Sequence, residues 1–268
     1  MYTIKKPSGD LGSVVDYFWE LHVLPAHSSF VEYMFSYPFA NLVINLSEGY
    51  TTIDSQGEVS HISGDRFIGG RFKPISYIHP SGNKLFGIKF KPGGTCAVAT
   101  IPADRTINRV LHLSHFLGKK GADNLVSLRG EHDFDSRVMH AENVIRRMAD
   151  PRQLVHLEWL SSVMGPIVEN SHFEMNIHAI ATAHQQSVKT LERRFKRFIG
   201  RGPKEVFNAL RCRAATREIL KTGNYSDCLG FGYYDQSHYN KELKHFTGTT
   251  VSALLARIKV TRRFGTQR

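Results

Sequence analysis

The sequence lacks the features that mark membrane proteins, secreted proteins and most common enzymes. It has no stretch of about 18 consecutive apolar residues, which argues against a membrane-spanning helix. Its three cysteines, Cys96, Cys212 and Cys228, form no C-x-x-C pair and cannot all pair within the chain, which fits a reducing compartment. It also has no glycine-rich phosphate loop, nucleophile elbow or H-E-x-x-H zinc motif. We therefore expect a cytoplasmic protein that is not an enzyme, with no catalytic residues, metal, cofactor or membrane contact.

The charge of the chain is distributed unevenly. Of its 268 residues 41% are hydrophobic, which is enough for two domains with cores of their own. Residues 170–268 hold 18 Lys and Arg against 7 Asp and Glu, whereas residues 1–169 hold 17 of each kind. The formal net charge of +11 therefore lies entirely in the C-terminal segment. A basic segment suits nucleic acid, but it also suits acidic proteins and anionic membranes, so charge alone does not identify the partner.

A short helix near the C-terminus carries the most informative pattern. Gly232 provides a turn, and Asp235 has a carboxylate that can cap the helix after it. Tyr239, Leu243 and Phe246 fall on one side of that helix at i, i+4 and i+7. The other side carries polar and basic residues, namely Gln236, Ser237, His238, Lys241 and Lys244. Short polar side chains at a helix start can read base edges while the cations behind them hold phosphates, so the pattern predicts a recognition helix.

The same arrangement occurs once upstream. Ser187 can cap a helix that ends at Gly200. The apolar side of this helix consists of Leu191, Phe195, Phe198 and Ile199. Its outward side consists of Lys189, Glu192, Arg193, Lys196 and Arg197. With its preceding helical segment, each copy is predicted to form a helix-turn-helix unit, at about residues 176–200 and 224–248.

A long helix is predicted between the two units. Pro203 suits a first-turn position, and Gly223 suits the residue after the last turn. About 19 residues at 1.5 Å each make a rod of roughly 28 Å. Successive major-groove faces of a duplex are roughly 34 Å apart, so one chain can place both recognition helices in adjacent grooves.

Residues 176–255 resemble the paired helix-turn-helix domain of the AraC/XylS family of bacterial transcription regulators. The most specific part is 232–248, where a turn glycine, an aromatic residue, Asp-Gln-Ser-His, another aromatic residue and a basic helix ending in Thr-Gly follow the family signature. A Gly-Pro-Lys linker start lies at 202–204. The sequence departs from the family at five positions: Tyr233 and Leu243 replace Phe, Val251 replaces Pro, Gln185 replaces the first turn glycine, and Gly230 stands inside a predicted helix.

The resemblance implies roles for individual side chains. The positions for base readout are Lys189, Glu192, Arg193, Gln236, Ser237 and His238. The positions for phosphate contact are Lys196, Arg197, Lys241 and Lys244, and the helix caps are Ser187 and Asp235. Arg193 suits the O6 and N7 atoms of guanine, and Glu192 suits a cytosine amino group. The alternative for each is a solvated surface side chain; it is weakest for Arg193 and Gln236, where helix position and side-chain type agree.

The N-terminal part reads as short strands separated by turns. The β-rich runs lie at 14–19, 42–46, 51–53, 58–62, 75–78 and 86–90. They predict a small β-barrel or β-sandwich. Residues 18–20, 42–46 and 87–94 also resemble, less specifically, the cupin-like domain in front of some AraC-type regulators. That resemblance implies a sensor domain over 1–100 for a small-molecule effector of unknown identity.

Residues 101–170 turn helical and form a predicted linker region. Apolar residues repeat at helical spacing over 138–148 and again over 154–164, where Gly165 and Pro166 are expected to end the helix, and 123–135 reads as a polar connection. This region can bury its apolar surface within the chain or against a second copy. The predicted fold is α+β: a cupin-like β-barrel, the helical linker, and an all-α DNA-binding domain over 171–268.

The leading interpretation is a transcription regulator that binds double-stranded DNA and responds to an effector. RNA polymerase and a second copy of the chain are further candidate partners. The alternative is a metal-dependent cupin-type enzyme or sensor that uses the basic domain for localisation. Its candidate ligands are His22, His27, His61 and His79, although none belongs to an H-x-H pair with a following carboxylate.

Overall fold

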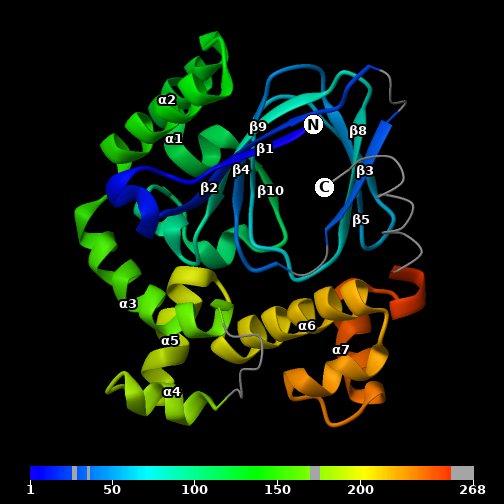
Figure 1. The fold of residues 1–268 in the computed structure, drawn as a ribbon. Helices are drawn as coiled ribbons and strands as arrows, with labels where there is room; N and C mark the ends of the chain where they lie inside the picture. The colour runs from blue at the N-terminus through cyan, green and yellow to red at the C-terminus, as the bar shows by residue number, and fades with distance from the viewer. Residues whose placement is uncertain (26–28, 35–36, 170–175, 255–268) are drawn as a thin grey trace.

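The computed structural model describes residues 1–25, 29–34, 37–169 and 176–254. Two antiparallel sheets face each other, helices α1 to α3 lie beside one of them, and helices α4 to α7 lie together beneath both (Figure 1). The fold is therefore α+β, as predicted. His27, residues 170–175 of the predicted boundary and the basic C-terminal tail lie outside the described residues.

The larger sheet has six strands in the order β1-β2-β9-β4-β7-β10. Their bounds are Tyr2–Lys5 (β1), Val15–His22 (β2), Lys84–Phe90 (β9), Asn41–Asn45 (β4), Arg66–Ile68 (β7) and Val110–His112 (β10). All their pairings are antiparallel. Strand β10 extends the sheet beyond residue 100, and we call residues 1–112 the sheet domain.

The smaller sheet has four antiparallel strands in the order β3-β8-β5-β6. Their bounds are Ser29–Met34 (β3), Ile75–Pro80 (β8), Tyr50–Asp54 (β5) and Val59–Ile62 (β6). Along β8, Ile75, Tyr77 and His79 are buried and alternate with less buried residues, as expected for a strand with one face in a core. Tyr50 and Tyr77 share a cluster with Val43 and Leu85 of the larger sheet, so side chains of the two sheets pack together between them.

The other face of the larger sheet is covered by the middle helices. These are α1 (Leu113–Val126), α2 (Phe134–Met148) and α3 (Pro151–Glu169), with a short 3-10 segment, η4 (Ser127–Gly130), after α1. Phe116 of α1 stacks on Phe67 of β7 with ring centroids 3.6 Å apart. Val138 and Ala141 of α2 belong to the same apolar cluster, so this region buries its surface within the chain.

Two expectations for the middle region are wrong. The polar connection expected from residue 123 includes the last turn of α1, because Leu125 at that end is buried in the core. Helix α3 also continues past Gly165 and Pro166. Met164 and Ile167 on either side of that pair are buried, and their packing outweighs the backbone hydrogen bond that a proline removes.

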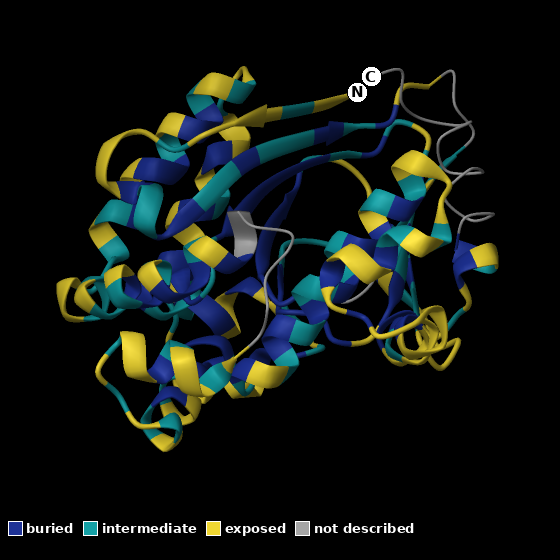
Figure 2. Cartoon of the chain, turned by 60° about the horizontal axis from the view of Figure 1, so that its bottom comes forward, coloured by how far each residue is buried: buried dark blue, intermediate teal, exposed yellow. Residues whose placement is uncertain are grey.

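The C-terminal domain consists of helices joined by tight turns. Its elements are α4 (Ile177–Ala183), α5 (Val188–Ile199), α6 (Pro203–Thr222), the 3-10 segment η5 (Tyr225–Phe231) and α7 (Gln236–Thr247). Buried residues follow the inner sides of the helices and the strands, while exposed residues collect on the outer turns of the helices (Figure 2). No helix within the described ranges is both long and apolar enough to span a bilayer.

One apolar cluster joins the sheet domain to the C-terminal domain, and we call it the joint core. It includes Phe39, Phe72 and Ile107 of the sheet domain, Leu160, Met164 and Ile167 of α3, and Phe195, Phe198 and Ile199 of α5. Gly200 lies at this contact with φ of 85°, and a Cβ atom there would come within 2.8 Å of the Ala103 carbonyl oxygen. The glycine thus ends α5 and also lets the sheet domain approach its backbone.

Candidate DNA-binding surface

The first helix-turn-helix unit consists of α4 and α5. The turn between them contains Gln185 in the left-handed region, with φ of 52°, where the sequence lacks the usual glycine. The Ser187 hydroxyl accepts a hydrogen bond from the backbone N–H of Thr190 at 3.2 Å, which caps α5. Leu191 and Phe195 are fully buried, so one side of α5 is fixed and the other is free for a ligand.

The second unit consists of η5 and α7. Gly232 forms the turn with φ of 75°, and the Asp235 carboxylate accepts a hydrogen bond from the backbone N–H of His238 at 2.7 Å. The expectation of an α-helix around Gly230 is wrong, since 225–231 is a 3-10 segment. A glycine weakens an α-helix, which is consistent with the tighter and shorter form observed here.

An ion pair fixes α7 on α6. Glu242 of α7 accepts hydrogen bonds from the Arg211 guanidinium of α6 and from the Tyr233 hydroxyl, each at 2.7 Å. The guanidinium carbon of Arg211 also lies 4.4 Å from the centre of the Tyr233 ring. Arg211 therefore holds the second unit against α6. Burial raises the pKa of the Tyr233 hydroxyl, so this group stays protonated and donates to Glu242. We call these three residues the α6–α7 brace.

Helix α6 also supports the first unit. Phe207 of α6 meets Phe195 of α5 edge to face, with centroids 5.3 Å apart. At 1.5 Å per residue, the 20 residues of α6 span roughly 30 Å between the two units. Units α4–α5 and η5–α7 lie toward opposite ends of α6 (Figure 1).

The structure leaves the outward side chains of both recognition helices exposed. On α5 these are Lys189, Glu192, Arg193, Lys196 and Arg197, and on α7 they are Gln236, Ser237, His238, Lys241 and Lys244. The amide nitrogen of Gln236 lies 3.3 Å from the Ser226 hydroxyl oxygen and donates to it, which orients this side chain at the start of α7. Arg194, by contrast, is taken up in packing, because its guanidinium lies 3.6 Å from the centre of the Trp159 ring on α3.

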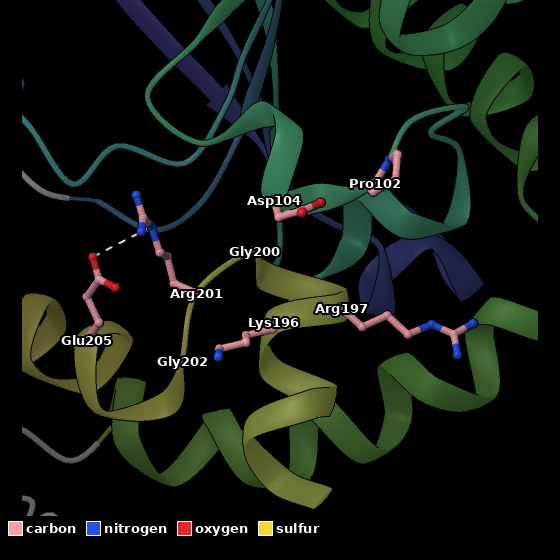
Figure 3. Close-up of a pocket in the computed structure, with 8 residues that line it drawn as sticks. All are labelled: Pro102, Asp104, Lys196, Arg197, Gly200, Arg201, Gly202 and Glu205. Carbon is pink, nitrogen blue, oxygen red and sulfur yellow. Dashed lines mark ion pairs between the residues drawn. The ribbon is translucent and has the colours of Figure 1, made fainter. Parts of the chain in front are cut away.

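Lys196 and Arg197 border a pocket of about 380 Å³ between α5, the start of α6 and the sheet domain. Lys196 points toward the turn at Gly202, whereas Arg197 points the other way (Figure 3). The sheet domain contributes Asp104 to the same pocket, and this carboxylate is exposed. A DNA phosphate near Lys196 would therefore approach a carboxylate as well.

Sequence reasoning missed one exposed residue at the second unit. Tyr234 stands between the turn glycine and the cap of α7, and its relative exposure is 90%. An aromatic side chain left in solvent at the start of a recognition helix is a candidate contact for DNA. The sign of this residue in the sequence is a pair of consecutive tyrosines, Tyr233 and Tyr234, directly after the turn glycine.

The sheet domain shows no metal centre within the described residues, where no three His, Cys, Asp or Glu side chains lie close enough to hold an ion. His22, His61 and His79 are not brought together as ligands there. His79 instead bonds through Nδ1 to Asn83 Oδ1 at 3.1 Å.

Comparisons with known proteins agree with this division. Residues 180–257 match the family model of a helix-turn-helix domain, and residues 4–112 match that of a domain of unknown function, DUF6597. The second match covers the sheet domain closely. No curated protein matches the chain.

Several solved structures are similar at low identity. Apo ToxT from Vibrio cholerae shares 10% identity and a TM-score of 0.44, over 94% of this chain and 99% of that one. ToxT with a bound unsaturated fatty acid shares 10% and 0.44, over 88% and 94%. The AraC-like transcriptional activator CuxR shares 12% and 0.27, over 85% and 89%.

Two capped helix-turn-helix units joined by one long helix define the class of DNA-binding proteins that carry two such units in a single chain. The family match shows a helix-turn-helix domain over 180–257, and the signature at 232–248 within it resembles that of the AraC/XylS family of transcription regulators.

Proposed function

We propose that the chain regulates transcription by placing α5 and α7 in adjacent major grooves, under the control of a small molecule bound by the sheet domain. The observation that carries this proposal is the pairing of two exposed recognition faces with a 20-residue helix between them. The protein acts through its occupancy of DNA rather than through catalysis, and its place of action is the cytoplasm. RNA polymerase and a second copy of the chain are the partners that such control would use.

The roles of individual residues follow from their exposure. Base readout is proposed for Lys189, Glu192 and Arg193 in the first unit and for Gln236, Ser237 and His238 in the second. Phosphate contacts are proposed for Lys196, Arg197, Lys241 and Lys244. Arg193 is the strongest candidate for specificity, because a guanidinium can donate two hydrogen bonds to one guanine. Tyr234 is added as a contact to the DNA backbone or to a thymine methyl group.

Control by an effector needs a physical connection between the two domains. We take the sheet domain, residues 1–112, as the sensor, residues 113–170 as the linker and residues 171–268 as the DNA-binding domain. The Tyr33 hydroxyl of β3 donates to the Thr247 carbonyl at the end of α7 at 2.6 Å. The Cys96 thiol donates to the Phe198 carbonyl at the end of α5 at 3.4 Å, and burial raises its pKa to about 11.

Through these two hydrogen bonds the sensor contacts the C-terminal ends of both recognition helices. A ligand that prefers one arrangement of the sheet domain would shift the relative placement of α5 and α7, and with it the affinity for DNA. The shift cannot exceed the difference in ligand affinity between the two arrangements.

The test is selection of bound duplexes from a random pool by the full-length protein, followed by affinity measurements against salt. We expect two conserved blocks about 10 base pairs apart and a steep salt dependence. Arg193→Ala should relax one base preference in one block, and Gln236→Ala should relax one in the other. A single block, or loss of the same block in both variants, would contradict reading by two helices.

A further inference from the structure

Three buried side chains with polar ends meet on the inner face of the smaller sheet. Tyr50 of β5 and Tyr77 and His79 of β8 are each at most 3% exposed. The ring centroids of Tyr50 and Tyr77 are 6.0 Å apart, and that of His79 lies 5.3 Å from Tyr50 and 6.3 Å from Tyr77. The three rings therefore form one group within the sheet domain.

Among the described residues, the polar end of each ring lacks a hydrogen-bond partner. Within the described part of the chain, the hydroxyls of Tyr50 and Tyr77 and the Nε2 atom of His79 are buried and make no hydrogen bond. A buried polar group without a partner costs free energy, and most such groups in folded proteins are satisfied. Three of them in one place are a feature that folding alone does not favour.

The hydrogen bonds around His79 indicate what the site can accept. The Asn83 amide nitrogen donates to the Glu48 carbonyl at 2.8 Å, so the Asn83 oxygen faces His79. Nδ1 of His79 therefore carries a proton and donates to that oxygen, and Nε2 is an acceptor whenever the ring carries that proton alone. The site thus offers one acceptor and two hydroxyls to a ligand.

The surroundings favour a ligand that is neutral and mostly apolar. Leu21, Val43, Ile68 and Leu85 of the larger sheet belong to the same cluster as Tyr50 and Tyr77. The Glu32 carboxylate lies 3.8 Å from His79 Nε2, and a negative charge there disfavours an anion.

We propose that Tyr50, Tyr77 and His79 form the effector site and bind a small, neutral, apolar molecule that carries a hydroxyl group, such as a phenol or an alcohol. The ligand hydroxyl donates to His79 Nε2 and accepts from the hydroxyls of Tyr50 and Tyr77. The inference rests on the proposed function only in calling the ligand an effector; the binding site itself follows from the geometry.

The test uses phenol and cyclohexanol as probes with the full-length protein, benzene as an apolar control and benzoate as an anionic one. Binding is measured by calorimetry and by the shift in melting temperature. We expect both hydroxylated probes to bind more tightly than benzene and benzoate. Tyr50→Phe and Tyr77→Phe should each lower the affinity for phenol about tenfold, while Tyr225→Phe in η5 should leave it unchanged.

The same variants separate a ligand site from a purely structural cluster. Without ligand, Tyr77→Phe should melt no lower than the parent protein, because it removes a hydroxyl that has no partner. A lower melting temperature for Tyr77→Phe, or phenol binding that is absent or equal in all variants, would overturn the site. Phenol binding that depends on Tyr77 but leaves affinity for the selected DNA unchanged would uphold the site and refute regulation through it.

Discussion

The α6–α7 brace can be broken at one residue, Glu242, whose carboxylate accepts hydrogen bonds from Arg211 and Tyr233 at 2.7 Å each. The side chains of Glu242 and Arg211 are only 12% and 18% exposed, so the pair is shielded from water. Glu242→Gln keeps the shape but removes the charge, and should lower the free energy of unfolding by about 1.5–3 kcal/mol. Glu242→Ala leaves a half-buried guanidinium without its carboxylate and should cost about 3–5 kcal/mol.

The assay is urea unfolding followed by far-UV circular dichroism, combined with duplex selection. The matched control is Glu218→Gln on α6, the helix that carries Arg211, where Glu218 pairs with the exposed Lys221 at 3.4 Å. An exposed pair of this kind contributes about 0–1 kcal/mol. In selection, both Glu242 variants should lose preferences in the block read by α7 and retain those of α5. Equal losses of stability in the Glu242 and Glu218 variants, or equal weakening of both blocks, would refute the assignment of the brace.

Three further predictions concern charge. Arg193→Ala should weaken binding to the selected duplex by about 1–3 kcal/mol and relax one base preference, whereas Lys241→Ala should weaken binding to all duplexes alike; equal, sequence-independent losses would contradict readout by Arg193. Asp104→Asn should strengthen DNA binding about two- to fivefold at low salt, because it removes a carboxylate beside Lys196, and Asp123→Asn on α1 should have no effect in the same titration. Burial lowers the pKa of Lys89 well below its ordinary value in the folded protein. The unfolded chain therefore holds the Lys89 proton more tightly than the folded protein does. As a result, the free energy of unfolding rises with pH until the pH reaches the ordinary lysine pKa. Lys89→Met should therefore raise the melting temperature at neutral pH, and a gain that does not shrink as the pH rises would show that the buried charge is not its cause.

The recognition helices could be predicted from the sequence because their determinants are local. Ser187 and Asp235 lie three residues before the N–H groups they cap, and the apolar residues repeat at helical spacing. The hairpin around Gly57 could be predicted for the same reason, because β5 and β6 pair directly across a short turn. In such cases a few neighbouring residues decide both the element and its ends.

Contacts between distant segments could not be predicted in this way. Arg211 and Glu242 are 31 residues apart, and Tyr33 and Thr247 are 214 apart. Sequence spacing also gave no sign that Arg194 would stack on Trp159 while its neighbour Arg193 stays exposed. The cluster around Tyr77 was hidden for the same reason, because its members come from strands that only the folded sheet brings together.

The joint core has a consequence for exchanging parts between regulators. Phe39, Phe72 and Ile107 of the sheet domain are buried against α3 and α5, and Gly200 admits the Ala103 backbone at the same contact. A chimera that joins this DNA-binding domain to a foreign sensor would expose those aromatic surfaces unless the new sensor supplied a matching face. In proteins with this fold, the sheet domain and the DNA-binding domain are therefore expected to evolve together. A change on one side of the joint core would be matched by a compensating change on the other.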